Sequence, residues 1–590
     1  MARQAGWMGG AVLLGAIWAA LGGATVMAAT TVHVQQHGAI PDDGKDDTAA
    51  VAAAIKALPA ESGHLILDKG RYDLKAQRYP NGQPFGLAFR DLANVTIDGR
   101  GATLMFADVM PALAFNKCRG VVVRNLTIDY ARPPFSVGRV VARAPGSFDV
   151  QVEAQFPVAG GEPVGAFMEY DPKTRLPLRH GVDAYDWVDS TELAGPQRLR
   201  VKLKGDPNRS GQLTEGALVV LRHQVYGHSA LSCVECSDVR IEDVTVRTAP
   251  GMGLIANHTT NMLIRRLAVC PPPGADRIMS TTADATHFNG CMGEIRIEDC
   301  TFEGMGDDAV NVHGMWHVVR QIVDDRTIVT ACRNDWINPP QVGHVMEFAS
   351  IETILPCGSA KVVAVDVDRQ AKTHRLRFDA PLPAALKVGD VAGDVNWAPK
   401  LRITGCTTRG NRARGFLIQT RDALIENNTF DRCTGAGIHV TTDVHHWKES
   451  IGTRNVVIRN NTFTGCNYAA ARAEAVINVF AHVDNWQLAP QPGVHRNVTI
   501  EGNTIRGTER AAIFVSATDG AVVRGNTIAD CCRAPDRTSS QSAIYFYGVR
   551  NAQAIGNRFE GDRPPQMRDA IGIGPGCQAD TITIRDNEGF

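Results

Sequence analysis

Residues 425–430 read Ile-Glu-Asn-Asn-Thr-Phe, and residues 458–463 read Ile-Arg-Asn-Asn-Thr-Phe. The unit recurs as Ile-Glu-Gly-Asn-Thr-Ile at 500–505, as Val-Arg-Gly-Asn-Thr-Ile at 523–528 and as Ile-Gly-Asn-Arg-Phe at 555–559. Apolar and polar residues alternate within each unit, as in a half-buried strand. The Asn-Asn and Gly-Asn pairs mark turns, because Asn and Gly tolerate left-handed backbone. Short strands that recur with a turn predict a solenoid.

Looser copies of the same unit precede this set. They lie at residues 94–99, 124–129, 240–246, 264–269 and 295–302. Most neighbouring copies are about 22 to about 42 residues apart, and the longer spacings imply loops that project from one face. The pattern predicts an all-β protein folded as a right-handed parallel β-helix. A β-propeller is the alternative, but its blades need four-stranded antiparallel sheets, whereas single strands recur here.

Two stretches interrupt the repeat. Residues 131–228 and 317–398 contain strand-like segments without Asn-turn units, so each is predicted to be an inserted small domain that resembles a β-barrel. The predicted organisation is a signal peptide (1–29), an N-terminal cap with the first β-helix coils (30–130), a first inserted β domain (131–228), coils that carry three aspartates (229–316), a second inserted β domain (317–398) and the C-terminal coils (399–590).

The N-terminus has the pattern of an export signal. Arg3 supplies a positive charge, residues 7–21 are apolar and rich in small side chains, and Val26-Met27-Ala28 suits cleavage. A membrane anchor is the alternative, but the apolar run is short for a bilayer span. We therefore expect an exported protein, periplasmic or secreted, without a membrane span.

The charge balance narrows the class of partner. The chain has 61 Lys and Arg against 62 Asp and Glu, a formal net charge of −1. Nothing in this balance indicates a nucleic-acid or anionic-membrane partner. The sequence does not determine the oligomeric state, and a homodimer remains one alternative.

The fourteen cysteines follow the repeat rather than a disulfide pattern. Cys433, Cys466 and Cys531 each lie four residues after a Thr in related units. Recurrence at one place in a repeat indicates a buried stack of reduced thiols, which behave as small apolar side chains. Cys233 and Cys236 form a Cys-x-x-Cys pair, but no second pair stands at zinc-site spacing, so we expect no metal there.

Three aspartates lie on two neighbouring repeat units. Asp284 precedes Asp307 and Asp308 by 23 and 24 residues, about one coil of the repeat. Coils of a β-helix stack at about 4.8 Å, so the three carboxyls should form one cluster. Glycoside hydrolysis needs a protonated carboxyl together with a carboxylate, and crowding raises the pKa of one member of such a set.

Two other interpretations of the cluster stay open. A lone Gly-Asp-Asp most often caps a turn, but Asp284 one coil earlier, with His287 and His313 nearby, favours catalysis. The second alternative is a Ca²⁺ site on adjacent coils, as in pectate lyases, with Arg412 or Arg414 as base.

Several motifs resemble known β-helix families. Residues 36–48, followed by a helical run, resemble the entry segment of pectate-lyase-like β-helices, where a helix caps the first coil. Thr282-Ala283-Asp284 followed by Gly306-Asp307-Asp308 is similar to the pattern of family 28 polygalacturonases, although their Gly-His-Gly and Arg-Ile-Lys segments have no clear equivalent. The whole layout is more similar to glycoside hydrolase family 110, on account of residues 306–314 (Gly-Asp-Asp-Ala-Val-Asn-Val-His-Gly), the inserted domains and residues 414–420.

That resemblance implies an exo-acting α-1,3-galactosidase that inverts configuration and uses no cofactor. Its catalytic aspartates would correspond to Asp284, Asp307 and Asp308, with acid and base roles unassigned. Its partner would be an oligosaccharide or glycoconjugate with terminal α-galactose, either the fucosylated blood-group B branch or linear Gal-α-1,3-Gal.

Substrate-binding candidates surround the cluster in sequence. The candidates are His287, His313, Arg414, Gln419 and Trp447. Arg414 and Gln419 are expected to hydrogen-bond sugar hydroxyls, with pairing to the aspartate cluster as the alternative for Arg414, and Trp447 to stack on a sugar face. Three further tryptophans could also stack on a sugar, although packing or a loop position is the more common role of such a residue: Trp316, Trp336 and Trp486. His445-His446 does not suit a metal, because neighbouring residues on a strand point apart.

Two rival functions differ in what they require. A polygalacturonase or other polyuronide-degrading enzyme of the same fold needs a cleft rich in Lys and Arg to hold uronate carboxylates. Arg412 and Arg414 alone are weak evidence for such a cleft. A non-catalytic carbohydrate-binding solenoid needs only dispersed turn-capping acids.

Overall fold

The computed structural model describes residues 29–333, 339–469, 473–483, 490–533 and 541–589. The predicted signal peptide, apart from residue 29, lies outside this range, as do Trp336 and Trp486. Among the described helices, none is long and apolar enough to cross a membrane.

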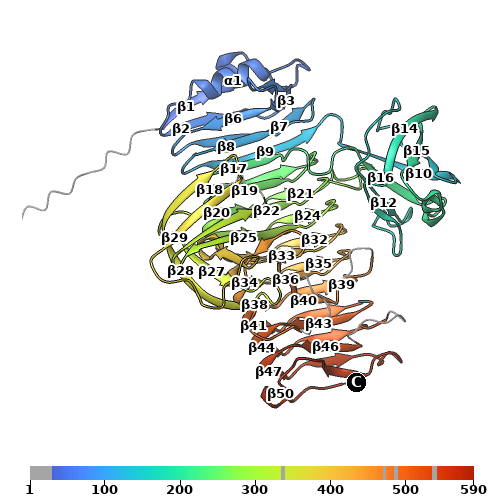
Figure 1. The fold of residues 1–590 in the computed structure, drawn as a ribbon. Helices are drawn as coiled ribbons and strands as arrows, with labels where there is room; N and C mark the ends of the chain where they lie inside the picture. The colour runs from blue at the N-terminus through green and yellow to red at the C-terminus, as the bar shows by residue number, and fades with distance from the viewer. Residues whose placement is uncertain (1–28, 334–338, 470–472, 484–489, 534–540, 590) are drawn as a thin grey trace, which may run out of the picture.

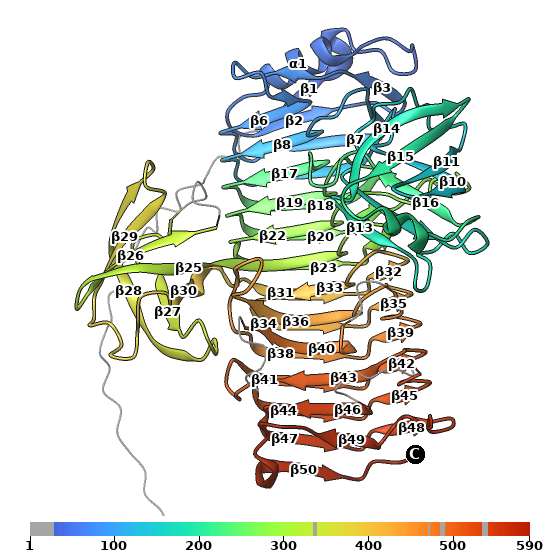
Figure 2. The same ribbon diagram turned by 45° about the vertical axis from the view of Figure 1, so that its right-hand side comes forward.

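The main body is a β-helix, in which coils stack from the N-terminal helix to the last strand (Figures 1 and 2). One wall is a 23-stranded sheet whose ladder pairs are all parallel. Its strands are β1 (Thr30–His33), β2 (Gly63–Ile66), β3 (Arg71–Leu74), β7 (Thr96–Phe106), β9 (Val122–Tyr130), β18 (Ser237–Val246), β20 (Thr260–Arg265), β21 (Ala268–Val269), β23 (Met292–Glu298), β24 (Thr301–Glu303), β31 (Lys400–Thr404), β32 (Thr407–Arg409), β34 (Arg421–Glu426), β35 (Thr429–Asp431), β38 (Arg454–Arg459), β39 (Thr462–Thr464), β41 (His495–Glu501), β42 (Thr504–Arg506), β44 (Thr518–Arg524), β45 (Thr527–Ala529), β47 (Arg550–Ile555), β48 (Arg558–Glu560) and β50 (Ile582–Arg585).

A second parallel wall carries the functional residues. Its strands are β6 (Leu87–Arg90), β8 (Leu113–Asn116), β17 (Leu231–Val234), β19 (Leu254–Asn257), β22 (Thr286–Asn289), β25 (Val310–Asp324), β33 (Phe416–Ile418), β36 (Ile438–Asp443), β40 (Ala475–His482), β43 (Ala511–Ser516), β46 (Ser542–Tyr547) and β49 (Asp569–Ile573). One apolar core runs between the walls along the whole stack. The predicted parallel β-helix is therefore confirmed, and α1 (Thr48–Lys56) covers its N-terminal end (Figure 1).

The first inserted sheet has seven antiparallel strands and its own apolar core. They are β10 (Phe135–Ala144), β11 (Ser147–Val152), β12 (Ala166–Tyr170), β13 (Asp183–Tyr185), β14 (Val188–Gly195), β15 (Arg198–Leu203) and β16 (Leu218–Arg222), with a 3-10 turn at Pro207–Gln212. The sheet order leaves β13 and β14 at its two edges, so this sheet does not close into a barrel.

The second inserted sheet is a closed six-stranded barrel. The end of β25 continues out of the β-helix and pairs with β26 (Thr327–Cys332) and β30 (Val391–Asp394), and the ring is completed by β27 (Val345–Ala349), β28 (Pro356–Asp368) and β29 (Thr373–Phe378). It too has its own core. The remaining short elements are β4 (Gln77–Arg78), β5 (Pro84–Phe85), β37 (Glu449–Ser450) and 3-10 turns at Val34–His37, Val395–Trp397 and Ala579–Thr581.

The repeated Asn of the sequence unit forms a ladder inside the β-helix. In each pair the Nδ2 of one Asn donates to the Oδ1 of the next at 2.9–3.0 Å, along the series Asn428, Asn461, Asn503, Asn526, Asn557 and Asn587. Each Oδ1 also accepts a backbone N–H from the preceding coil. The cysteines of the repeat units, Cys433, Cys466 and Cys531 among them, are free thiols.

Candidate active site

Two of the three aspartates and an arginine occupy equivalent places on consecutive coils, and Asp307 directly precedes one of them. Thr286, Val310 and Phe416 are aligned across β22, β25 and β33. Asp284, Asp308 and Arg414 each lie two residues before the aligned position. Because parallel strands in register place equivalent residues above one another, the turns before these strands bring the side chains to one edge of the wall.

Backbone hydrogen bonds link the stacked turns. The Asp308 N–H donates to Asp284 Oδ1 at 3.0 Å, and the Arg414 N–H donates to Asp308 Oδ1 at 2.8 Å. The Arg414 guanidinium also pairs with Asp308 Oδ2 at 2.9 Å. One oxygen from each of Asp284, Asp307 and Asp308 lies within 4.8 Å of the others, and all three residues are buried.

Asp307 is held from the side of the first inserted sheet. Arg412 Nη1 donates to Asp307 Oδ1 at 3.0 Å, and the Tyr226 hydroxyl donates to Oδ2 at 2.7 Å. Arg412 is itself held by Asp183 of β13, at 2.8 Å from its Nε. Tyr185, also of β13, lies with its ring between Arg412 and Arg222. The site therefore combines the β-helix with the first inserted sheet.

Sequence reasoning missed Tyr226, Asp183, Tyr185 and Arg222. They lie in or beside the stretch where the repeat disappears, so no periodicity marks them. Arg222 is almost fully buried, and its Nη1 donates to the carbonyls of Thr282 and Gly306 in the turns that carry the aspartates. A lone Arg on an apolar strand was the only available signal.

The surroundings shift the pKa values of the three carboxyls in different directions. Burial raises the pKa of Asp284 and of Asp308 well above the ordinary value. Burial acts in the same direction on Asp307, but Arg412, Arg414 and the Tyr226 hydroxyl together outweigh it and lower the pKa of that carboxyl. The cluster therefore favours one ionised carboxyl beside others that retain a proton.

Two predicted histidines extend the cluster. His287 Nδ1 lies 2.7 Å from Asp284 Oδ2, and His287 Nε2 lies 2.9 Å from His313 Nε2. His313 also lies 3.6 Å from Glu449 of β37, and Glu449 accepts a hydrogen bond from Gln419 at 2.5 Å. Glu449 was not singled out in the sequence.

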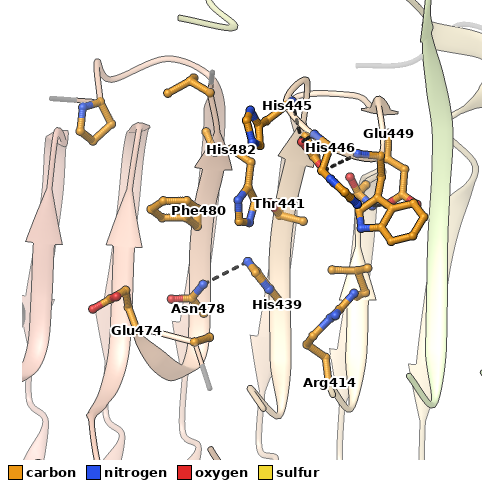
Figure 3. Close-up of a pocket in the computed structure, with 18 of the residues that line it drawn as sticks. Arg414, His439, Thr441, His445, His446, Glu449, Glu474, Asn478, Phe480 and His482 are labelled. Carbon is orange, nitrogen blue, oxygen red and sulfur yellow. Dashed lines mark hydrogen bonds between the residues drawn. The ribbon is translucent and has the colours of Figure 1, made fainter. Parts of the chain in front are cut away.

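A cavity of about 610 Å³ adjoins the cluster on its C-terminal side. Arg414, Gln419 and Glu449 belong both to its lining and to the hydrogen-bonded surroundings of the aspartates, while the aspartates themselves lie beside it. Figure 3 shows that β36 and β40 contribute His439 and Asn478, whose side chains are 3.1 Å apart. The cavity thus places polar groups along the coils that follow the carboxyls.

Trp447 also lines this cavity and is 44% exposed. Its ring is stacked under the guanidinium of Arg333, 4.5 Å away, which comes from the loop after β26. Trp316 is buried instead, with its Nε1–H bonded to Thr442 Oγ1 at 3.1 Å, so it is a packing residue. The structure therefore gathers seven of the eight predicted site residues around the cluster and places Trp447 at the cavity.

The carboxyl oxygens are spaced closely enough to surround a cation. Cationic side chains already occupy this position, however: Arg412 pairs with Asp307, and Arg414 pairs with Asp308. These two guanidinium groups supply the positive charge that a metal would otherwise contribute, which disfavours the Ca²⁺ interpretation.

The fold is a right-handed parallel β-helix with carboxyls stacked on adjacent coils, and residues 391–588 match the family model described as "Right handed beta helix region". Over nearly the whole chain it is similar to proteins named Alpha-1,3-galactosidase. It is 27% identical to Alpha-1,3-galactosidase A of Bacteroides fragilis (91% of this chain, 93% of that protein) and 28% identical to that of Shewanella woodyi (90% and 91%). It is 25% identical to Alpha-1,3-galactosidase B of Bacteroides thetaiotaomicron (91% and 92%). These relatives confirm the resemblance to glycoside hydrolase family 110.

Proposed function

We propose that the protein is an exo-acting glycoside hydrolase that releases terminal α-1,3-linked galactose from oligosaccharides or glycoconjugates, with inversion and without a cofactor. The single observation that carries the proposal is the cluster of Asp284, Asp307 and Asp308, buried on adjacent coils beside a cavity. The relatives named alpha-1,3-galactosidase, which align along about 90% of the chain, support the substrate class.

The protonation pattern suits glycosidic bond cleavage. One carboxyl must donate a proton to the leaving oxygen while another, ionised, activates water. Arg412 and Tyr226 favour the ionised form of Asp307, whereas burial favours the protonated forms of Asp284 and Asp308. The cluster therefore favours an ionised carboxyl beside protonated ones, and the roles within it are left to experiment.

The cavity supports exo action on a neutral sugar. Its volume of about 610 Å³ suits a small ligand rather than an extended polysaccharide. Among the described residues that line it, Arg414 is the sole Lys or Arg, and it is already paired with Asp308. Asp443, Glu449 and Glu474 would repel a uronate, so the polygalacturonase alternative is disfavoured.

Inversion rests on the family resemblance. Oxygens within 4.8 Å are closer than the roughly 6.5–9.5 Å between carboxyls of many inverting enzymes. The anomer of the product therefore has to be measured. Export is likewise proposed from the N-terminal sequence, and the cleaved N-terminus of protein recovered from culture tests it.

The test is galactose release from Gal-α-1,3-Gal and from the fucosylated B trisaccharide, followed by NMR for wild type and Asp308→Asn, with and without a chelator. We expect β-galactose from the wild type in both buffers and a loss of about 10²-fold or more in the variant. Cleavage of the linear disaccharide decides whether the fucose branch is required. Absence of galactose from both substrates contradicts the proposal, and intact binding without turnover favours a carbohydrate-binding solenoid.

A further inference from the structure

A chain of hydrogen bonds runs from Asp284 to the backbone carbonyl of Gly314 through two histidines. Asp284 Oδ2 is 2.7 Å from His287 Nδ1, and His287 Nε2 is 2.9 Å from His313 Nε2. His313 Nδ1 is 2.8 Å from the Gly314 carbonyl oxygen. The chain therefore contains three contacts, and each needs one hydrogen between its two heavy atoms.

The Gly314 carbonyl sets the direction of the whole chain. A carbonyl oxygen can only accept, so His313 Nδ1 carries the hydrogen. In neutral His313 the Nε2 then accepts, and His287 Nε2 must donate. In neutral His287 the Nδ1 accepts in turn, so the hydrogen toward Asp284 comes from a protonated carboxyl. Moving that proton onto either imidazole gives an imidazolium and a carboxylate, and the number of hydrogens shared by Asp284, His287 and His313 stays the same.

Removal of this proton leaves one of the three contacts without a hydrogen between its two heavy atoms. With Asp284 ionised and both rings neutral, lone pairs face each other either between the two Nε2 atoms or between His313 Nδ1 and the Gly314 carbonyl. A buried polar contact that loses its hydrogen bond is destabilising, because the desolvation of its polar atoms is no longer offset. Asp284 and His313 are each 4% exposed and the His287 side chain is 14% exposed, so water has little access to replace the missing hydrogen.

The charged groups around this chain of hydrogen bonds come from three neighbouring segments of the protein. Asp307, on the turn before β25, favours retention of the proton, whereas the backbone N–H of Asp308 on the same turn donates to Asp284 Oδ1 at 3.0 Å and opposes it. Glu449 of β37 faces His313 at 3.6 Å and also favours retention. Arg414, before β33, opposes retention but is paired with Asp308. Burial and Asp307 raise the pKa of Asp284, while burial lowers the pKa of both imidazoles.

We propose that His287 and His313 are positioning residues that keep one proton in the chain with Asp284. The Gly314 carbonyl fixes the tautomers, and the chain stays electrically neutral. Asp307 and Asp308 then face a neutral unit instead of a third carboxylate, so that one of them can ionise beside the other. This inference deepens the proposed function and rests on it for the activity assays alone.

The first experiment reads the histidines directly. Full-length wild type labelled with ¹⁵N-histidine is followed by NMR from about pH 5 to about pH 8, the range in which ordinary imidazoles titrate, with assignment from His287→Gln and His313→Leu. We expect His313 to carry its hydrogen on Nδ1 and His287 to carry one on Nε2 throughout. A neutral His287 protonated on Nδ1 alone overturns the proposal, whatever the enzyme does to galactosides.

The second experiment separates positioning from a general structural role. His313→Leu frees His287 to take the other tautomer and to donate to ionised Asp284. The basic limb of the kcat/KM profile should then move down by about one pH unit, with KM within about twofold of wild type. His258→Gln is the control, because His258 is a largely buried histidine outside the chain. A uniform loss at every pH, without a shift, overturns the proposal. If wild type releases no galactose, the proposed function fails, while the NMR result still decides the proton chain.

Discussion

Tyr226 shows how a residue outside the repeat can control a carboxyl within it. Its hydroxyl donates to Asp307 at 2.7 Å, and its side chain remains half exposed beside the cluster. A hydrogen bond to an ionised carboxylate is stronger than one between neutral groups. Tyr226 therefore helps Arg412 to favour the ionised form of Asp307, and the same exposed ring is accessible to a sugar.

We predict that Tyr226→Phe lowers kcat/KM for galactose release by about tenfold, because about 1.5 kcal/mol of hydrogen bonding to Asp307 is lost. The matched control is Tyr72→Phe. This variant also removes side-chain hydrogen bonds, those of the Tyr72 hydroxyl with Gln35 and with the Asp68 carbonyl, but Tyr72 lies near the N-terminal cap and outside the site. The control should lose stability and keep wild-type kinetics. Wild-type kcat/KM in Tyr226→Phe would contradict the role given to this hydroxyl.

The raised pKa of Asp284 predicts how the free energy of unfolding depends on pH. Its pKa is raised in the folded protein, so the stability that it contributes is fully present below the unfolded pKa of about 3.9 and is lost as pH rises through the folded value. Asp284→Asn cannot ionise, and its amide can donate to His287 where the protonated carboxyl does. Between about pH 5 and about pH 8 the variant should therefore lose less unfolding free energy than wild type, by on the order of 1–2 kcal/mol.

Urea unfolding at both pH values measures this difference. Asp519→Asn is the control, because Arg550 and Asn551 lower the pKa of Asp519 despite partial burial. Its stabilising effect is present above the unfolded pKa and lost only as pH falls toward the folded value. The control should thus change stability equally at both pH values. A pH slope in Asp284→Asn as steep as that of wild type would show that Asp284 is already ionised.

At the scale of the element, the Asn of each repeat unit is a structural residue. Asn461 is buried, donates to the Ile425 carbonyl and to Asn503, and accepts from Asn428 through both backbone and side chain. Every hydrogen bond of this amide is made to a neighbouring coil. The ladder therefore ties each coil to the next and fixes the register of the strands on either side.

We predict that Asn461→Ala destabilises the protein by about 2–4 kcal/mol, because it leaves polar groups on two neighbouring coils without partners. Thr462→Ala, one residue later at an exposed position of β39, should change stability by less than about 0.5 kcal/mol. Thermal and urea unfolding of both variants measures the difference. Equal stabilities would mean that stacking of the apolar core alone holds these coils together.

The features that could be predicted from the sequence are those that a local repeat pattern specifies. The Asn-turn units predicted the β-helix because each unit specifies its own strand and turn, and one coil of spacing brought Asp284 beside Asp307 and Asp308. Tyr226, Asp183 and Arg222 could not be predicted in the same way. Their approach to the cluster depends on how the first inserted sheet docks, which is a long-range contact without periodicity. The open edges of that sheet, at β13 and β14, were equally invisible.

At the scale of the whole molecule, the two inserted sheets flank the site. The first reaches the β-helix through Asp183 and Arg412 near the cluster, and through an Arg179–Glu509 ion pair farther along the stack. The second contributes Arg333, which stacks on Trp447 and donates to the His446 carbonyl at 3.3 Å. One insertion therefore supports the carboxyls, and the other supports Trp447 in the lining of the cavity.

This division predicts different kinetic signatures for the two insertions. Arg333→Ala removes the cation–π contact that orders Trp447, worth about 0.5–1 kcal/mol at an exposed site. KM for the B trisaccharide should rise about two- to fivefold with kcat unchanged, because the lost contact affects bound substrate and transition state alike. Arg326→Ala is the control, since Arg326 lies on the same barrel and bonds the Asp379 carbonyl away from the cavity. A fall in kcat for Arg333→Ala would place the second insertion in the chemical step, and an unchanged KM would remove Trp447 from the substrate-binding surface.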